Sequence, residues 1–234
     1  KTTVMDGHGG YMNGSRYYGE DLPINTWYMK RFAGLSEDGL SLWYYTDKET
    51  NEEKTTTTYS TGDFYLCGDP NPDLYGGFGT SITFHGFDLS TQFSYLVGGL
   101  TYDYGYAGMM GNPTATSVGN RWHKDVLKAW SPENPSSTIP RWHFNDLNTT
   151  GSSDRFLIDG SYLNLQNIQV GYTLPDSWTS HLKIKNLRLY FVCDNVYYWS
   201  KRKGLDPRRS ISGVGTSGKI APFRTYSGGI SLQF

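Results

Sequence analysis

The chain has few charges and few cysteines for its 234 residues. Lys, Arg, Asp and Glu make up 18% of it, below the roughly 25% usual in soluble domains, and they balance to a net charge of −1. This balance gives no electrostatic reason to expect nucleic acid as a partner. The two cysteines, Cys67 and Cys193, are too few for a disulfide framework, and we expect both to be free thiols.

Long hydrophobic runs and catalytic motifs are lacking as well. No apolar run approaches the roughly 20 residues that a membrane-spanning helix needs. The five histidines show no metal-ligand spacing, and no G-x-S-x-G motif or carboxylate pair stands out. Residues 213–219 match the start of a phosphate-binding loop, but Ile220 replaces the required Ser or Thr and Pro222 blocks the helix. We therefore expect no enzyme, no metal and no cofactor.

Glycine and aromatic residues are abundant instead. The chain holds 28 Gly and 19 Tyr, and aromatic residues reach 16%. A polar chain this rich in aromatic residues is typical of a transmembrane β-barrel wall, which has one apolar face, one polar face and aromatic residues at both membrane interfaces.

Alternation with a period of two residues recurs along the chain and predicts antiparallel strands. The clearest stretch ends at Phe234, whose aromatic ring on an amphipathic strand resembles the assembly signal of outer-membrane barrels. Another stretch changes phase near Gln166–Asn167, which predicts a β-bulge. The predicted strands cover residues 78–84, 89–97, 162–174, 182–198 and 226–234, with weaker ones over 27–35 and 40–46.

The connections between these strands alternate in length. The stretches 85–88 and 175–180 are short, whereas 47–75, 100–153 and 199–222 are long. Short turns at one end and long loops outside the cell are typical of outer-membrane barrels. Five to seven strands cannot close a wide barrel, and open edges cannot face lipid, so we expect the remaining strands to come from a part of the protein that precedes this chain.

Several segments, taken together, resemble the SusC/RagA family of TonB-dependent transporters. The resemblance covers nearly the whole chain in order, and it departs mildly where Val196 replaces the Leu that usually follows Asn195. The segments that carry it are Asn71–Phe78, Trp130–Asn134, Asp154–Ile168, Gly171–Pro175, Ile184–Tyr190, Gly204–Pro207 and Pro222–Phe234.

The resemblance implies an all-β fold, namely a transmembrane antiparallel β-barrel of about 22 strands with long extracellular loops. Residues 1–234 would be the C-terminal part of the barrel domain, without the plug and N-terminal domains. The implied function is TonB-dependent import of a large nutrient, a glycan oligosaccharide or an oligopeptide, across the cell outer membrane of a Gram-negative member of the Bacteroidota. The implied partners are a SusD-like lipoprotein, the TonB complex, the remainder of the barrel and outer-membrane lipid.

Aromatic residues of the 100–153 segment are the candidate substrate-binding residues, because aromatic faces stack on sugar rings and peptide side chains. Alternatively, they pack the loop itself or touch the lipoprotein. The segment also predicts a short amphipathic helix over 120–130. The candidates are Tyr102, Tyr104, Tyr106, Trp122, Trp130 and Trp142. Membrane-interface anchoring is expected instead for Trp27, Trp43, Tyr197, Tyr198 and Trp199.

Two other functions fit the same pattern. One is a surface barrel or adhesin that transports nothing. The other is a soluble glycan-binding β-sandwich, in which the apolar stripes 187–191 and 230–234 would form the core between two sheets.

Overall fold

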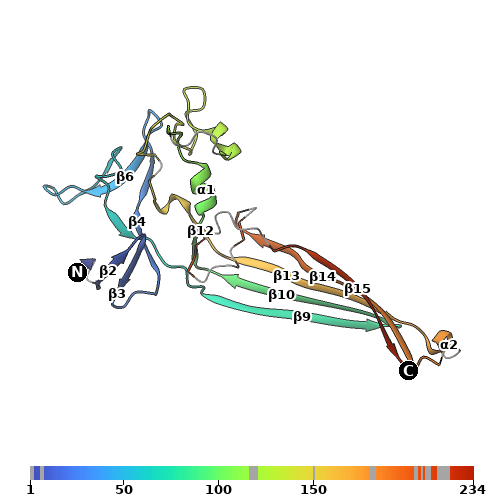
Figure 1. Cartoon of the computed structure of the whole chain (residues 1–234). Helices are drawn as coiled ribbons and strands as arrows, with labels where there is room; N and C mark the ends of the chain where they lie inside the picture. The colour runs from blue at the N-terminus through green and yellow to red at the C-terminus, as the bar shows by residue number, and fades with distance from the viewer. Residues whose placement is uncertain are drawn as a thin grey trace. The chain divides into compact units, whose positions relative to one another are not determined.

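The chain folds into two compact units in a computed structural model (Figure 1). The first unit comprises residues 1–71, 99–159 and 209–218, and the second comprises 72–98, 160–208 and 219–234. No described helix has the length and apolar character needed to cross a membrane. The structure describes all residues except 1, 2, 6, 7, 116–120, 150, 180–182, 203, 204, 207, 209–211 and 215–221, so most of the phosphate-loop-like stretch lies outside the described residues.

The second unit is a five-stranded antiparallel sheet in which strands that follow one another in the unit pair with one another, in the order β15-β14-β13-β10-β9. All five strands were predicted from the alternation, although β9 begins four residues earlier and β14 four residues later than expected. The strands are β9 (Leu74–Phe84), β10 (Phe87–Val97), β13 (Tyr162–Thr173), β14 (Asn186–Ser200) and β15 (Thr225–Gln233).

Tight connections gather at one end of this sheet. His85 and Gly86 join β9 to β10 with φ of 48° and 86°, the positive pair that a two-residue hairpin turn requires. The short helix α2 (Asp176–Thr179) follows β13 at the same end, where the C-terminus also lies (Figure 1). We call this the turn end and the opposite one the loop end.

The predicted bulge is present between β13 and β14. Leu165 pairs with Tyr197 but Asn167 pairs with Asp194, so the two strands have unequal numbers of residues between these pairs. On β14 the irregularity includes Asn195, whose φ of 52° is left-handed, a conformation that Asn tolerates better than most other residues with side chains. The phase change in the sequence therefore marks a real irregularity of the ladder.

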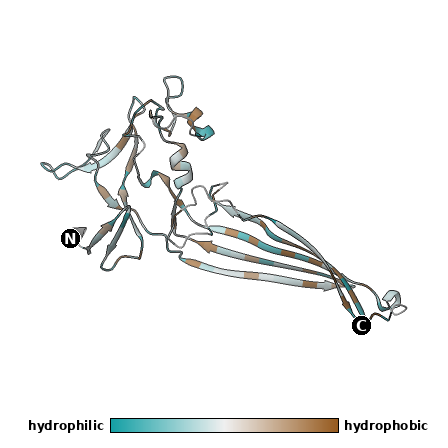
Figure 2. Ribbon diagram, in the orientation of Figure 1, coloured by the Kyte–Doolittle hydropathy of each residue, from teal (hydrophilic) through white to brown (hydrophobic). Residues whose placement is uncertain are grey.

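Cross-strand register places the apolar positions of all five strands on one face. One row of successive partners runs through Ile82, Leu89, Val170, Phe191 and Gly228. Figure 2 shows hydrophobic residues alternating with more polar ones along these strands. Because side chains alternate between faces, the sheet has an apolar face and a polar face.

The opposite face carries mostly polar or small side chains. Its adjacent row of partners runs through Thr83, Asp88, Gly171, Tyr190 and Gly229.

The apolar face is exposed to the surroundings rather than packed against a second layer. Phe191, near the middle of its strand, is 50% exposed, and Ile82 and Ile230 are exposed as well. A β-sandwich would bury these stripes, so their exposure argues against the soluble sandwich.

Aromatic residues lie near both ends of the apolar face. Phe84, Phe87 and Tyr172 are at the turn end, while Tyr197 and Trp199 are at the loop end with ring centroids 4.8 Å apart. Two aromatic bands on either side of a mostly aliphatic zone are the pattern of a membrane-spanning wall.

Three of the residues expected at the membrane interface lie elsewhere. Tyr198 points to the polar face, because its neighbours Tyr197 and Trp199 occupy the apolar one. Trp27 and Trp43 are fully buried in the first unit, so their expected role as interface anchors is wrong. Their large rings fill the interior of that unit instead.

The first unit is built from short strands in two small sheets and one pair. One sheet has the order β1-β2-β3-β4-β8, the other β5-β6-β7, and β11 pairs with β12. The weaker predicted strands over 27–35 and 40–46 therefore exist, but outside the five-stranded sheet. The elements are β1 (Thr3–Met5), β2 (His8–Asn13), β3 (Arg16–Gly19), β4 (Thr26–Lys30), β5 (Phe32–Leu35), β6 (Ser41–Thr46), β7 (Glu53–Thr56), β8 (Phe64–Leu66), β11 (Leu100–Tyr102) and β12 (Leu157–Asp159), with the helices α1 (Tyr104–Met109), η1 (Lys124–Lys128) and η2 (Asp154–Phe156).

The first unit has a hydrophobic core of its own, formed by Trp27, Met29, Tyr102, Met110 and Phe156. These residues come from both of the long segments that make up the unit. The stretches expected to be loops between barrel strands therefore pack into a folded body.

The amphipathic helix predicted over 120–130 is wrong for the residues described. Only the 3₁₀ helix η1 forms there, and Leu127 on it is 90% exposed rather than sharing a buried side with Val126. So short a segment cannot sustain a helix from its own propensity, and here packing does not favour one.

The left-handed position at the bulge gives a direct test. Asn195→Val should destabilise the sheet by about 1–2 kcal/mol, because a β-branched residue is strained at positive φ, whereas Asn195→Gly should be tolerated. Denaturant unfolding of the purified protein would measure both. Equal effects of Val and Gly would show that the backbone conformation of Asn195 is not what matters.

Candidate functional site

The polar face carries a connected set of side chains near its loop end. Ser94, Asn164 and Tyr198 are successive cross-strand partners on β10, β13 and β14. Asn164 is only 3% exposed, although this face of the sheet is covered by no second layer of strands in the described unit. The segment that follows β14 covers it.

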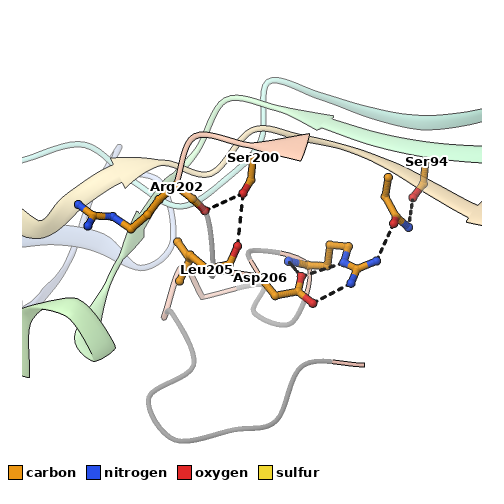
Figure 3. A network of polar contacts seen from close by, with 7 residues as sticks. Ser94, Ser200, Arg202, Leu205 and Asp206 are labelled. Atoms are coloured by element: carbon orange, nitrogen blue, oxygen red, sulfur yellow. Dashed lines mark hydrogen bonds and ion pairs between the residues drawn. The ribbon is translucent and has the colours of Figure 1, made fainter. Parts of the chain in front are cut away.

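The side chain of Arg208 covers Asn164. Its Nε and Nη2 donate to the two carboxylate oxygens of Asp206, each at 2.8 Å, and its Nη1 donates to Asn164 Oδ1 at 2.6 Å (Figure 3). Asn164 Nδ2 in turn donates to Ser94 Oγ at 3.4 Å. The guanidinium also lies 4.8 Å from the ring centroid of Tyr198. Arg208 thus joins the 201–208 segment directly to β13 and β14, and through Asn164 to β10.

The start of the 201–208 segment is fixed by Ser200, the last residue of β14. Its hydroxyl contacts the backbone carbonyls of Arg202 at 3.1 Å and Leu205 at 3.3 Å (Figure 3). The Asp206 carboxylate raises the pKa of Arg208 above its usual range, so the pair stays ionised at neutral pH. Since its charges are paired and its donors are used, this cluster positions the chain and offers no free cation to a ligand.

A second ion pair lies on the same face near the turn end. Arg188 donates to both oxygens of Asp88, at 2.9 and 2.6 Å, across Gly171 of the intervening strand. A Cβ on Gly171 would lie 2.4 Å from Asp88 Oδ1, so only glycine leaves room for this bridge. Between the two ion pairs, Asn167 Nδ2 donates to Asp194 Oδ1 at 2.7 Å. The polar face is therefore a hydrogen-bonded surface with paired charges.

The aromatic residues singled out from the sequence fall into three groups. Tyr102 is buried in the core of the first unit, and Tyr106 packs beside it while its hydroxyl donates to Asp125 Oδ2 at 3.1 Å. Trp130 is half-buried against Gly39, where an added Cβ would lie 2.3 Å from the ring.

The third group is the most accessible. Trp122 and Trp142 meet edge to face at 5.5 Å, and both indole nitrogens donate to the Gly111 carbonyl. Trp142 is 42% exposed, and Tyr104, which contacts Tyr102, is 38% exposed. Of the six candidates, Tyr104 and Trp142 present the most open surface.

Sequence reasoning missed the Asp206–Arg208 pair and Asn164. The only signal was an acid and a base two residues apart around Pro207, which is too common to identify a contact. No group of three or more His, Cys, Asp or Glu residues that could hold a metal occurs in the described part of the chain. Cys67 and Cys193 are free thiols, as expected.

The chain is similar to several receptors of known family. No protein-family model matches the sequence. It is 29% identical over 235 residues to TonB-dependent receptor P3 of Formosa agariphila, an alignment covering 96% of this chain and 22% of that receptor. It is 27% identical over 182 residues to TonB-dependent receptor SusC of Bacteroides thetaiotaomicron, covering 76% and 17%. The chain thus spans about a fifth of the length of these curated relatives.

The fold is also similar to that of known transporters. A structure of the RagAB peptide transporter superposes on 96% of this chain with a TM-score of 0.76 and 25% identity, and a structure of the RagAB peptide importer in the open-open state covers 100% with a TM-score of 0.75 and 26% identity. These matches use 24% and 25% of the neighbours' chains. In sequence and in fold, the chain is thus similar to TonB-dependent receptors of the SusC/RagA type. Its five-stranded sheet is part of a transmembrane β-barrel.

In this chain, Arg208 should hold the 201–208 segment on the five-stranded sheet. Replacing it by Gln removes three charge-assisted contacts, so proteinase K should cut within 201–208 roughly tenfold faster, corresponding to a loss of about 1.5 kcal/mol in local stability. Lys201→Gln, at an exposed neighbour, is the matched control. Cleavage of the Arg208 variant at the control rate would mean that other contacts hold the segment.

Proposed function

We propose that the chain is the C-terminal part of the barrel domain of an outer-membrane receptor that imports a large nutrient with energy delivered through TonB. The observation that carries this proposal is the two-faced sheet, with an exposed apolar face between aromatic bands and a hydrogen-bonded polar face. An apolar face toward lipid and a polar face toward a watery lumen are what a barrel wall requires.

The remainder of the receptor would complete this wall. Among the described strands, β9 and β15 each have one edge without a partner in the five-stranded sheet. Unpaired backbone groups facing lipid cost several kcal/mol each, so these edges need neighbouring strands. Strands supplied by the rest of the same protein, along with its plug and TonB-binding segment, satisfy that need.

An oligopeptide is the substrate class that we favour over a glycan oligosaccharide. Support comes from the two structural neighbours, which are described as a peptide transporter and a peptide importer. A SusD-like lipoprotein would close over the loops, as the family resemblance implies. Tyr104 and Trp142 are the best placed to touch the nutrient, while Tyr102, Tyr106, Trp122 and Trp130 would support the body that presents them.

Arginine scanning of two adjacent β14 residues tests the orientation of the wall. Phe191→Arg puts a charge on the apolar face and should cost about 2–4 kcal/mol, whereas Val192→Arg points to the polar face and should cost much less. Urea unfolding of the whole receptor in lipid vesicles would measure both. Similar losses for the two variants would be incompatible with a membrane wall in this orientation.

Uptake by cells tests transport itself. Cells carrying the whole receptor should accumulate labelled oligopeptides, and removal of TonB should abolish the accumulation. Trp142→Ala should lower uptake roughly two- to tenfold through lost aromatic contact, while Leu127→Ala, at another exposed apolar position of the same unit, should not. Peptide binding that persists without any TonB-dependent uptake would instead favour a surface barrel or adhesin.

A further inference from the structure

Arg155 is a half-buried cation with no hydrogen bond or ion pair to any described residue. It lies in η2, the short turn that leads into β12. Every guanidinium carries five N–H donors, and no nitrogen of Arg155 is among the fully buried polar atoms that lack a partner, so these donors keep access to solvent. The donors of Arg155 are therefore available to a ligand.

The surroundings of Arg155 are aromatic. Its guanidinium carbon lies 5.3 Å from the ring centroid of Phe32 and 5.1 Å from that of Phe156. The nearby phenol groups are engaged elsewhere, because Tyr106 donates to Asp125 and Tyr102 interacts with Ser152. The rings hold the cation by cation–π attraction and leave its hydrogen-bonding edge unused.

The neighbouring acid does not neutralise the charge. Asp154 Oδ1 accepts a hydrogen bond from the Phe32 backbone N–H at 2.8 Å, and this contact fixes η2 against the start of β5. Burial lowers the pKa of Arg155 to about 10, which leaves the group protonated at neutral pH. Arg155 is therefore a positioned cation without an anion.

We propose that Arg155 binds a carboxylate group of the imported oligopeptide. The planar guanidinium fork matches the two oxygens of a carboxylate, and partial burial strengthens such a pair relative to one in open water. The half-buried ring of Phe32 beside the fork suits the apolar parts of a peptide, whereas the ring of Phe156 is buried beneath it. This inference rests on the proposed import of peptides, and it adds a preference for free acids.

The test uses the whole receptor purified in detergent and a synthetic decapeptide library in two forms. One form has free carboxylates, and in the other every carboxyl group is converted to an amide. Mass spectrometry of the retained peptides gives the ratio of acid to amide forms. The wild-type receptor should favour the acid form roughly tenfold or more, the factor expected of a charge-assisted hydrogen bond worth about 1.5 kcal/mol or more.

Arg155→Gln should abolish this preference, and Arg155→Lys should retain part of it, because lysine keeps the charge but not the fork. Arg121→Gln, at an exposed arginine of the same unit, should behave as wild type. Thermal unfolding of each variant checks folding, and if the Gln variant fails to fold, the Lys variant alone must show the reduced preference.

Three results would overturn the inference. If wild type retains both library forms equally, Arg155 takes no peptide carboxylate although peptide binding stands. If Arg155→Gln lowers stability but keeps the acid preference, the carboxylate that pairs with Arg155 belongs to the rest of the receptor. If wild type retains no peptide at all, the proposed substrate class fails, and this inference fails with it.

Discussion

The register between the five long strands is the constraint on which the rest of this chain depends. Most rows of partners keep apolar residues with apolar residues, as in the row from Ile82 to Phe191, and polar residues with polar ones, although Val192 lies in a row of polar partners. Because the side-chain period is two, a slip of one residue in any strand would turn its apolar side chains toward the polar face. The His85–Gly86 turn and the β13–β14 bulge fix this register at two points. Both the apolar surface and the ion pairs on the opposite face follow from it.

The two units use aromatic residues in opposite ways. In the first, Trp27, Trp43 and Tyr102 are buried, and the surrounding segments fold as a small protein domain would. In the second, Phe191 and Trp199 face outward, because the solvent for that face is lipid and not water. One unit of the chain therefore buries its aromatic residues, and the other exposes them on its apolar face. The overall composition is the average of these two kinds of unit.

This difference explains what the sequence could predict. Strong alternation around Phe93 and Ile230 identified the strands, and a change of phase identified the bulge at Gln166, since both are local signals. Burial of Trp27 and the absence of a helix at Leu127 depend on contacts between distant segments, which leave no local trace. The Arg208–Asn164 contact joins residues 44 positions apart, and no periodicity in the sequence predicts it. Likewise, only the structure shows which of the candidate aromatic residues are exposed.

The bridge from Asp88 to Arg188 connects β10 to β14 while passing over Gly171 of β13. This ion pair therefore joins two strands that are not adjacent in the sheet. The backbone hydrogen bonds join only adjacent strands. Axial sliding of β10 past β14 would stretch both hydrogen bonds of the ion pair at once, whereas gentle curvature of the sheet would leave them nearly unchanged. The wall is accordingly stiff against shear near its turn end and compliant in bending.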